Sequence, residues 1–171
     1  MKSRDDSQCG PVRASSQRHV YHGFIPEGTV ALYGFLLNVL WEFSHSALYV
    51  DHFQRNISYI LWTRFHCSIG DVLILLGSFW WTALWFRTRF WFVQNRYYLP
   101  AILFVLSSFA YTGWSEWYNT RVTQAWSYSQ TMPTVFGIGI SPIAQWLILP
   151  PLVVLLLRRK NKSAVTKKAV A

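Results

Sequence analysis

The sequence is poor in charged residues, which make up 13% of its 171 positions, whereas 52% are hydrophobic. A soluble domain usually has about 25% charged residues. A chain with so few charges would leave much of a water-exposed surface apolar. Aromatic residues are abundant at 18%, and ten of them are tryptophan. This composition argues against an ordinary water-soluble domain and favours a membrane protein.

Cysteine is also scarce, and several catalytic motifs are missing. Cys9 and Cys67 are too far apart for a CxxC redox motif or a zinc-finger spacing, so we expect two incidental thiols. The chain contains no HExxH and no glycine-rich P-loop. Gly113–Trp117, GWSEW, departs from the GxSxG motif because tryptophan occupies the last position. These absences exclude the common signatures of metalloproteases, nucleotide phosphatases and serine hydrolases.

The apolar residues fall into four blocks, each long enough for the roughly 20 residues that a membrane-spanning helix requires. We place the predicted spans at Gly28–Val50, Ser68–Phe86, Leu99–Tyr118 and Thr134–Leu157. The polar residues 1–27 contain no apolar stretch typical of a signal peptide, so the first span is expected to target the chain to the membrane. Residues 158–171 form a basic tail. The predicted fold is an all-α integral membrane protein with one four-helix domain over residues 28–157.

The fourth block differs from the others because it contains several helix-breaking residues. Gly137, Gly139 and Pro142 lie in its first half, and Pro150–Pro151 follow in its second half. Proline removes a backbone donor and glycine weakens a helix. We therefore expect the fourth helix to be kinked or broken, either lining a cavity or packing closely against its neighbours through the glycines.

The distribution of lysine and arginine predicts the orientation of the spans. Residues 1–27 contain four basic residues, the second connection three and the C-terminal tail six, whereas the first connection has two and the third has one. Basic residues collect on the cytoplasmic side of membrane proteins. Both termini are therefore predicted to be cytoplasmic, in what we expect to be a bacterial inner (plasma) membrane. The net charge of +9 then reflects topology and contact with membrane lipids, and we expect no nucleic-acid partner.

Polar residues follow one face of the first predicted span. Their positions are separated by 4, 4, 3, 4 and 3 residues, which places them on one side of a helix. They are Gly34, Asn38, Glu42, His45, Tyr49 and His52. The other spans bring further polar groups to the same, outer half of the bundle. These are His66 and Asp71, Ser108 to Asn119 including Glu116, and Ser141 with Gln145. We therefore expect an outward-facing polar pocket.

Ionisable groups within a membrane indicate a functional site because an isolated charge there costs roughly 3 kcal/mol or more. The spacing of Glu42 and His45 suits ligation of one metal ion, with His66 as a tentative third ligand and Asp71 and Glu116 as further donors. The same residues suit acid–base catalysis. A hydrogen-bonded network that only fixes helix packing is the structural alternative.

Other cofactors and activities fit the sequence less well. A haem between His45 and His66 would place one ligand at a helix start instead of inside a span. An ion or proton path would need polar groups through the full depth, and the inner half offers few. A single divalent metal is therefore the favoured cofactor hypothesis.

The leading functional hypothesis is a small membrane enzyme that acts on a lipid or lipid-linked substrate. Its candidate catalytic residues are Glu42, His45, His66, Asp71 and Glu116, and its candidate substrate-binding residues are Asn38, Arg121 and Gln145. An arginine near aromatic residues at a membrane surface suits an anion such as a lipid phosphate, although pairing with Glu116 or hydration is the simpler role for Arg121. The alternative is a non-enzymatic component that binds another membrane protein.

Overall fold

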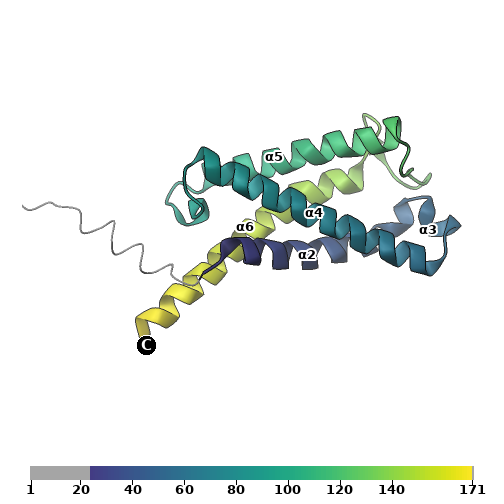
Figure 1. Ribbon diagram of the computed structural model, residues 1–171. Coiled ribbons are helices and arrows are strands. Elements are labelled where there is room, and N and C mark those ends of the chain that lie inside the picture. The colour runs from purple at the N-terminus through teal and green to yellow at the C-terminus, as the bar shows by residue number, and fades with distance from the viewer. Residues whose placement is uncertain (1–23, 171) are drawn as a thin grey trace, which may run out of the picture.

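The structure is a computed structural model that describes residues 24–170. Four long helices form an elongated bundle: α2 (Pro26–Ser44), α4 (Ile57–Trp85), α5 (Tyr98–Trp117) and α6 (Ile140–Val170) (Figure 1). Helices α2 and α5 each pack against both α4 and α6. The four predicted blocks are thus helical over most of their length. The predicted N-terminal tail up to residue 23, with Cys9, lies outside the described residues.

Short elements connect these helices. They are a 3₁₀ turn at Ser46–Leu48, α3 at Asp51–Gln54, a 3₁₀ turn at Trp91–Val93, a π-helical turn at Tyr118–Val122, β1 at Thr134–Val135 and β2 at Ile138–Gly139. Figure 1 shows α3 and the 118–139 connection at one end of the bundle. The 86–97 connection and the C-terminal part of α6 lie toward the other end. We call the first the loop end and the second the terminal end.

Two of the described helices are long and apolar enough to cross a membrane by length and composition. They are α4 and residues 140–163 of α6. The outward side chains of α4 include Trp62, Leu73 and Leu84, all more than half exposed. Large apolar side chains on the surface of a long helix are typical of contact with lipid.

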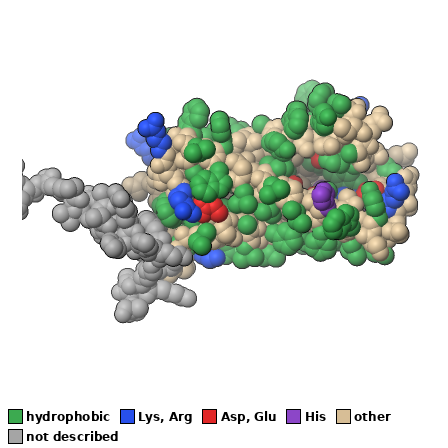
Figure 2. Space-filling model, in the orientation of Figure 1, with side chains coloured by type: hydrophobic (Ala, Val, Ile, Leu, Met, Phe, Trp, Pro, Cys, Tyr) green, Lys and Arg blue, Asp and Glu red, His purple; other side chains and the backbone are tan. Residues whose placement is uncertain are grey.

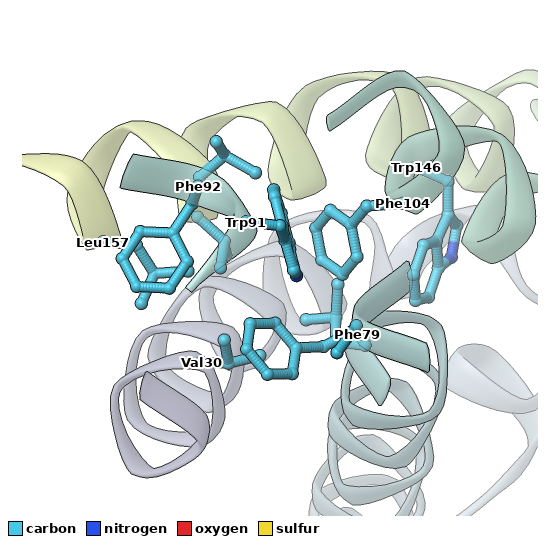
Figure 3. Packing of buried hydrophobic residues seen from close by; sticks show 11 residues of the cluster. Val30, Phe79, Trp91, Phe92, Phe104, Trp146 and Leu157 are labelled. Carbon is cyan, nitrogen blue, oxygen red and sulfur yellow. The ribbon is translucent and has the colours of Figure 1, made fainter. Parts of the chain in front are cut away.

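An aromatic core occupies the terminal half of the bundle. Trp91 and Phe92, from the 86–97 connection, are fully buried and turn inward between the helices. Figure 3 shows Trp91 beside Phe104 of α5 and Phe79 of α4. Ring centroids of Trp91 lie 5.6 Å from those of both Phe79 and Phe104, within the range for favourable aromatic pairs. Apolar packing thus fills this half, whereas buried charged groups gather toward the loop end.

Helix α2 ends earlier than the predicted first span. The Ser44 hydroxyl donates to the carbonyl oxygens of Leu40 and Trp41, and the His45 backbone N–H also donates to the Trp41 carbonyl oxygen at 3.0 Å. His45 is the C-terminal cap residue, and the chain then turns through residues 46–54. The prediction of one continuous helical face to His52 is therefore wrong beyond His45. Tyr49 and His52 lie in the connection.

Helix α4 begins eleven residues before the predicted second span, at Ile57 in place of Ser68. The Asn56 side chain accepts a hydrogen bond from the Tyr59 backbone N–H at 2.9 Å and caps the helix. The earlier start brings Arg64, which the sequence analysis assigned to the first connection, into the helix and into the bundle interior.

The fourth block divides into a hairpin and a helix. Strands β1 and β2 are antiparallel, and the turn between them has positive φ at Phe136 (52°) and Gly137 (79°). Two positive φ values are typical of a type I′ hairpin. Helix α6 starts only at Ile140, includes both Pro150 and Pro151, and continues through the predicted basic tail to Val170.

Candidate functional site

A cavity of about 380 Å³ opens toward the loop end of the bundle. Its lining comes from α2, α4, α5, α6 and the two connections at that end. Figure 2 shows a hollow in this part of the surface, with acidic side chains and a histidine near it. Four acidic residues line the cavity: Glu42, Asp51, Asp71 and Glu116. This volume is typical of a site for a small molecule or a lipid headgroup.

Glu42 and His45 lie together, as their spacing predicts. Glu42 Oε1 is 3.2 Å from His45 Nε2, and both side chains are buried, with exposed fractions of 8% and 6%. The two atoms lie close together without the alignment of a hydrogen bond, and His45 Nε2 has no hydrogen-bond partner in the structure. Glu42 lines the cavity, whereas His45 lies behind it. The Glu42 carboxylate can therefore contact a ligand in the cavity, while the His45 imidazole contacts the carboxylate from the side away from the cavity.

Ser141 links His45 to a neighbouring helix. Its Oγ lies 2.7 Å from His45 Nδ1 and 3.3 Å from Trp41 Nε1. An indole N–H can only donate, so Ser141 accepts from Trp41, and its hydroxyl can either donate to His45 Nδ1 or accept from it. This arrangement orients the imidazole for exchange of a proton with the carboxylate.

Arg64 joins the first connection to the bundle. Its Nη2 donates to both carboxylate oxygens of Asp51, at 2.7 and 2.8 Å, and its Nε donates to Ser46 Oγ at 3.1 Å. The guanidinium lies 5.0 Å from the Tyr49 ring centroid. Its Nη1 is 3.8 Å from Glu42 Oε2. The contact with both carboxylate oxygens of Asp51 thus matches most of the arginine charge.

A buried amide chain ties three helices together beside the cavity. Gln145 Nε2 of α6 donates to Asn38 Oδ1 of α2 at 2.8 Å and to Asp71 Oδ2 of α4 at 3.0 Å. Asn38 Nδ2 donates in turn to the Gly34 carbonyl oxygen at 2.8 Å. The close approach of α2 and α4 at this point depends on Gly34, because a Cβ there would lie 2.7 Å from Leu75 Cδ1. Asn38 does not line the cavity, whereas Gln145 and Asp71 do.

Glu116 is held from the 118–139 connection. Its Oε2 accepts hydrogen bonds from the Tyr128 hydroxyl and from Trp126 Nε1, the latter at 3.3 Å. The connection is itself anchored, since Ser127 and Ser129 exchange backbone hydrogen bonds with the 46–50 segment. Burial raises the pKa of Tyr128 above its usual value, and the adjacent Glu116 carboxylate raises it further. Tyr128 therefore remains a hydrogen-bond donor to Glu116 well above neutral pH.

Thr112 is the buried polar side chain without a partner at this site. Its exposed fraction is 8%, and its Oγ1 has no hydrogen-bond partner in the structure. Thr112 lies one helical turn before Glu116, and both line the cavity. An unsatisfied buried hydroxyl costs about 1–3 kcal/mol, so a ligand that bonded to Thr112 would recover that cost.

Two predicted site residues lie apart from the others. His66 lines the cavity but is exposed and stacks on Trp62, with ring centroids 6.1 Å apart. No described contact joins it to Glu42 or His45. Arg121 does not line the cavity and packs against the hairpin turn at Gly137.

The predicted metal site has no assembled set of ligands in residues 24–170. The structure places no group of three His, Cys, Asp or Glu side chains in this part of the chain where they could hold a metal ion. Glu42 and His45 supply two potential ligands, and His66 does not join them. The two histidines of the haem hypothesis are likewise separated in role, one buried and one exposed.

The main residues that the sequence analysis missed are Arg64 and Asp51. Arg64 precedes Asp71 by seven residues, or two helical turns, and this spacing places both on one face of an extended second helix. Recognition of Asn56 as a helix cap would have revealed that extension. Asp51 had no comparable signal, because its contact with Arg64 depends on the turn after α2.

Comparison with known proteins yields no relative from which a role can be transferred. No protein family, curated protein or solved structure matches the chain.

Proposed function

We propose that this chain is a membrane enzyme that acts on a lipid or lipid-linked substrate by acid–base catalysis. The observation that carries the proposal is the position of Glu42, which borders the cavity on one side and contacts His45 on the other. A carboxylate in this position can exchange a proton with a bound molecule while the imidazole accepts or returns that proton. Glu42 is the proposed catalytic residue, and His45 a positioning residue.

The proposed topology has four membrane spans, formed by α2, α4, α5 and α6, with both termini in the cytoplasm. Three facts support it. Two helices suit a membrane by themselves, and the other two pack against both of them. The basic 86–97 connection and the basic C-terminal part of α6 both lie at the terminal end. The cavity then opens to the outer side, within reach of outer-leaflet lipids.

Acid–base chemistry is favoured over a metal centre because Glu42 has its imidazole partner in place, whereas the described residues assemble only two metal ligands. The remaining predicted residues take supporting roles. Asp71 and Glu116 complete the cavity wall, and Gln145 orients Asp71.

The non-enzymatic alternative also has a specific observation in its favour. The Asn38–Gln145–Asp71 chain and the Arg64–Asp51 pair join separate segments through hydrogen bonds that need no ligand. If the cavity groups had only this role, Glu42 would be replaceable without loss of any activity.

The test uses purified protein reconstituted in vesicles made from the lipid extract of its expression host. Lipid composition is followed over time by mass spectrometry for the unaltered protein and for Glu42→Gln. We expect a lipid species to be converted by the unaltered protein and its conversion to slow about 10²–10⁴-fold in the variant, the usual contribution of a general acid or base.

Glu27→Gln is the matched control because Glu27 lies at the terminal end and pairs with Arg89 there, at 2.5 Å. It should retain conversion. Equal conversion by Glu42→Gln and the unaltered protein would refute the catalytic role of Glu42. Absence of any converted species would refute an enzyme acting on the lipids supplied.

A further inference from the structure

A second cavity adjoins the first. Its volume is about 280 Å³, and it lies between α5, the β1–β2 hairpin and the start of α6. The two cavities share four lining residues: Thr112, Glu116, Pro142 and Trp146. We call the first the polar cavity and the second the apolar cavity. The two cavities therefore lie side by side, with these four residues between them.

The two cavities differ sharply in chemistry. The polar cavity is bordered by carboxyl groups, amides and hydroxyls. Apart from Glu116 and Thr112 at the shared boundary, the apolar cavity is lined only by hydrophobic residues and glycine, among them Phe109, Ile138 and Ile143. An apolar space beside a charged one matches a molecule with a polar head and a hydrocarbon chain.

The hairpin forms the outer wall of the apolar cavity and holds an unusual residue there. Phe136 lines this cavity, is fully exposed and has a positive φ of 52°. The left-handed conformation is unfavourable for a residue with a Cβ. The backbone of Phe136 is therefore strained, and its ring is exposed at the mouth of an apolar cavity. An exposed ring in this position suits contact with hydrocarbon.

The charged residues that line the polar cavity indicate the charge of the headgroup that it would bind. Among its basic lining residues, Arg64 is paired with Asp51, and Arg55 is exposed and lies over the Tyr59 ring at 5.2 Å. Asp71 and Glu116 receive hydrogen bonds only from neutral donors, namely an amide, an indole and a hydroxyl. Both carboxyl groups therefore lack a cationic partner in the described structure.

Aromatic rings complete the lining of the polar cavity. They belong to Tyr49, Tyr59, Trp126 and Trp146. Carboxylates together with aromatic faces are the groups that bind ammonium ions. The unpartnered Thr112 hydroxyl, at the boundary of the two cavities, can in addition accept a hydrogen bond from an ammonium N–H.

We propose that the site binds a membrane amphiphile with a positively charged amine in its head, the head in the polar cavity and the hydrocarbon chain in the apolar cavity. The chain leaves between α5 and the β1–β2 hairpin. This proposal rests on the proposed function in that it names the substrate class of the same site.

The test uses the full chain in nanodiscs of phosphatidylglycerol, a lipid whose headgroup has no cation. The probes are a long-chain primary alkylamine with a diazirine in its tail and the alcohol of the same chain. After irradiation, labelled peptides are quantified by mass spectrometry. Labelling of residues 109–116 and 135–146 is divided by labelling of the outward face of α4, which corrects for different partitioning into the membrane.

We expect this ratio to be about tenfold higher for the amine than for the alcohol, as for the gain of a charged hydrogen bond. Asp71→Asn and Glu116→Gln should lower the ratio for the amine and leave that for the alcohol unchanged. An excess of ethylamine, which has the head without the chain, should compete weakly. Full competition by ethylamine would identify a water-soluble amine as the ligand and would overturn the proposal that the ligand is an amphiphile.

Gly113→Leu tests the path of the hydrocarbon chain. Gly113 lines the apolar cavity, and a Cβ added there meets no atom within 4 Å, so leucine would fill the cavity without displacing the core. Gly77→Leu on α4 is the matched control because its Cβ also meets no atom within 4 Å. Labelling should be lost in Gly113→Leu alone, with helical circular dichroism retained in both variants.

Two results would overturn the inference. Equal normalised labelling by amine and alcohol would refute a cationic head, and labelling unaffected by Gly113→Leu would refute the chain path. Failure of the proposed catalytic function can be distinguished from both of these results. If Glu42→Gln left lipid conversion unchanged while amine labelling remained selective, the binding site would stand without the catalytic role.

Discussion

At the scale of single residues, the candidate site contains two kinds of polar group. One kind has its hydrogen bonds completed within the protein, as Arg64 and Asn38 do. The other kind faces a cavity and can form further hydrogen bonds, as Asp71, Glu116 and Thr112 can. The first kind stabilises helix packing, and the second is available to a ligand. Each kind makes a different prediction for substitution.

Replacing Arg64 should destabilise the protein. Arg64→Met leaves Asp51 without its two charged hydrogen bonds, and loss of one partner of a buried ion pair costs about 3 kcal/mol or more. Because Asp51 keeps a 21% exposed side chain, we expect a loss of up to about 3 kcal/mol in the free energy of unfolding. Chemical denaturation in detergent measures it.

The double variant Arg64→Met/Asp51→Leu is the control for this prediction. It removes the unpaired carboxylate, so it should recover most of the lost free energy of unfolding. If the double variant were as unstable as Arg64→Met, the cost would arise from lost packing of the arginine side chain and not from the unpaired charge.

The hydrogen bond between Asn38 and Gln145 should contribute modestly. Interhelical hydrogen bonds in membrane proteins have a mean coupling of about 0.6 kcal/mol. A double-mutant cycle with Asn38→Leu and Gln145→Leu should give a coupling of this size, measured from free energies of unfolding. A coupling near zero would show that the 2.8 Å contact does not stabilise the pairing of α2 with α6.

At the scale of elements, the hairpin over residues 134–139 is the part that departs most from the predicted bundle. Glycine and proline indicated an interrupted fourth helix, and the structure replaces its outer portion with two short strands. This change makes a wall for the apolar cavity that a helix would not supply. The conformation of the turn is therefore linked to the shape of the site.

Gly137→Ala should open the hairpin. At φ 79° a Cβ is strained, and at this position it would also meet the Arg121 guanidinium. We expect faster hydrogen exchange across residues 134–139 and a destabilisation of roughly 1 kcal/mol or more. Gly113→Ala serves as the control, because a Cβ there meets no neighbouring atom and alanine favours a helix by roughly 0.5–1 kcal/mol. Unchanged exchange in Gly137→Ala would show that the turn tolerates a side chain.

At the scale of the whole molecule, the two ends of the bundle have different chemistry. The terminal half is closed by the aromatic core around Trp91, and the loop half is opened by the polar and apolar cavities. In the proposed topology this asymmetry places a sealed half toward the cytoplasm and an open half toward the outer leaflet. The orientation is directly measurable.

Cysteine labelling tests the orientation in intact cells. In a background with Cys9 and Cys67 replaced by serine, Gln130→Cys should react with a membrane-impermeant maleimide, whereas Ser163→Cys should react only after the membrane is opened. Both positions are exposed in the structure, so accessibility within the protein does not limit either reaction. Labelling of Ser163→Cys from outside would reverse the proposed topology, since basic residues near that helix end are expected to stay inside.

The sequence by itself determined the helical class, the presence of four long helices and the approach of Glu42 to His45. These features depend on local periodicity, in which apolar runs form helices and residues three apart share a face. The four membrane spans and their orientation remain predictions from composition and charge. Asp71, Glu116 and Gln145 were also placed at one depth by counting along each block.

Only the tertiary structure decided how these groups are partnered. The turn after α2 brings Asp51 to Arg64, and the 127–129 segment brings Tyr128 to Glu116, through contacts between residues distant along the chain or in loops without periodic pattern. It also separated His66 from Glu42 and His45, and formed the apolar cavity beside the polar one. Such contacts depend on the three-dimensional path of the connections, because no local pattern encodes which side chain will face which cavity.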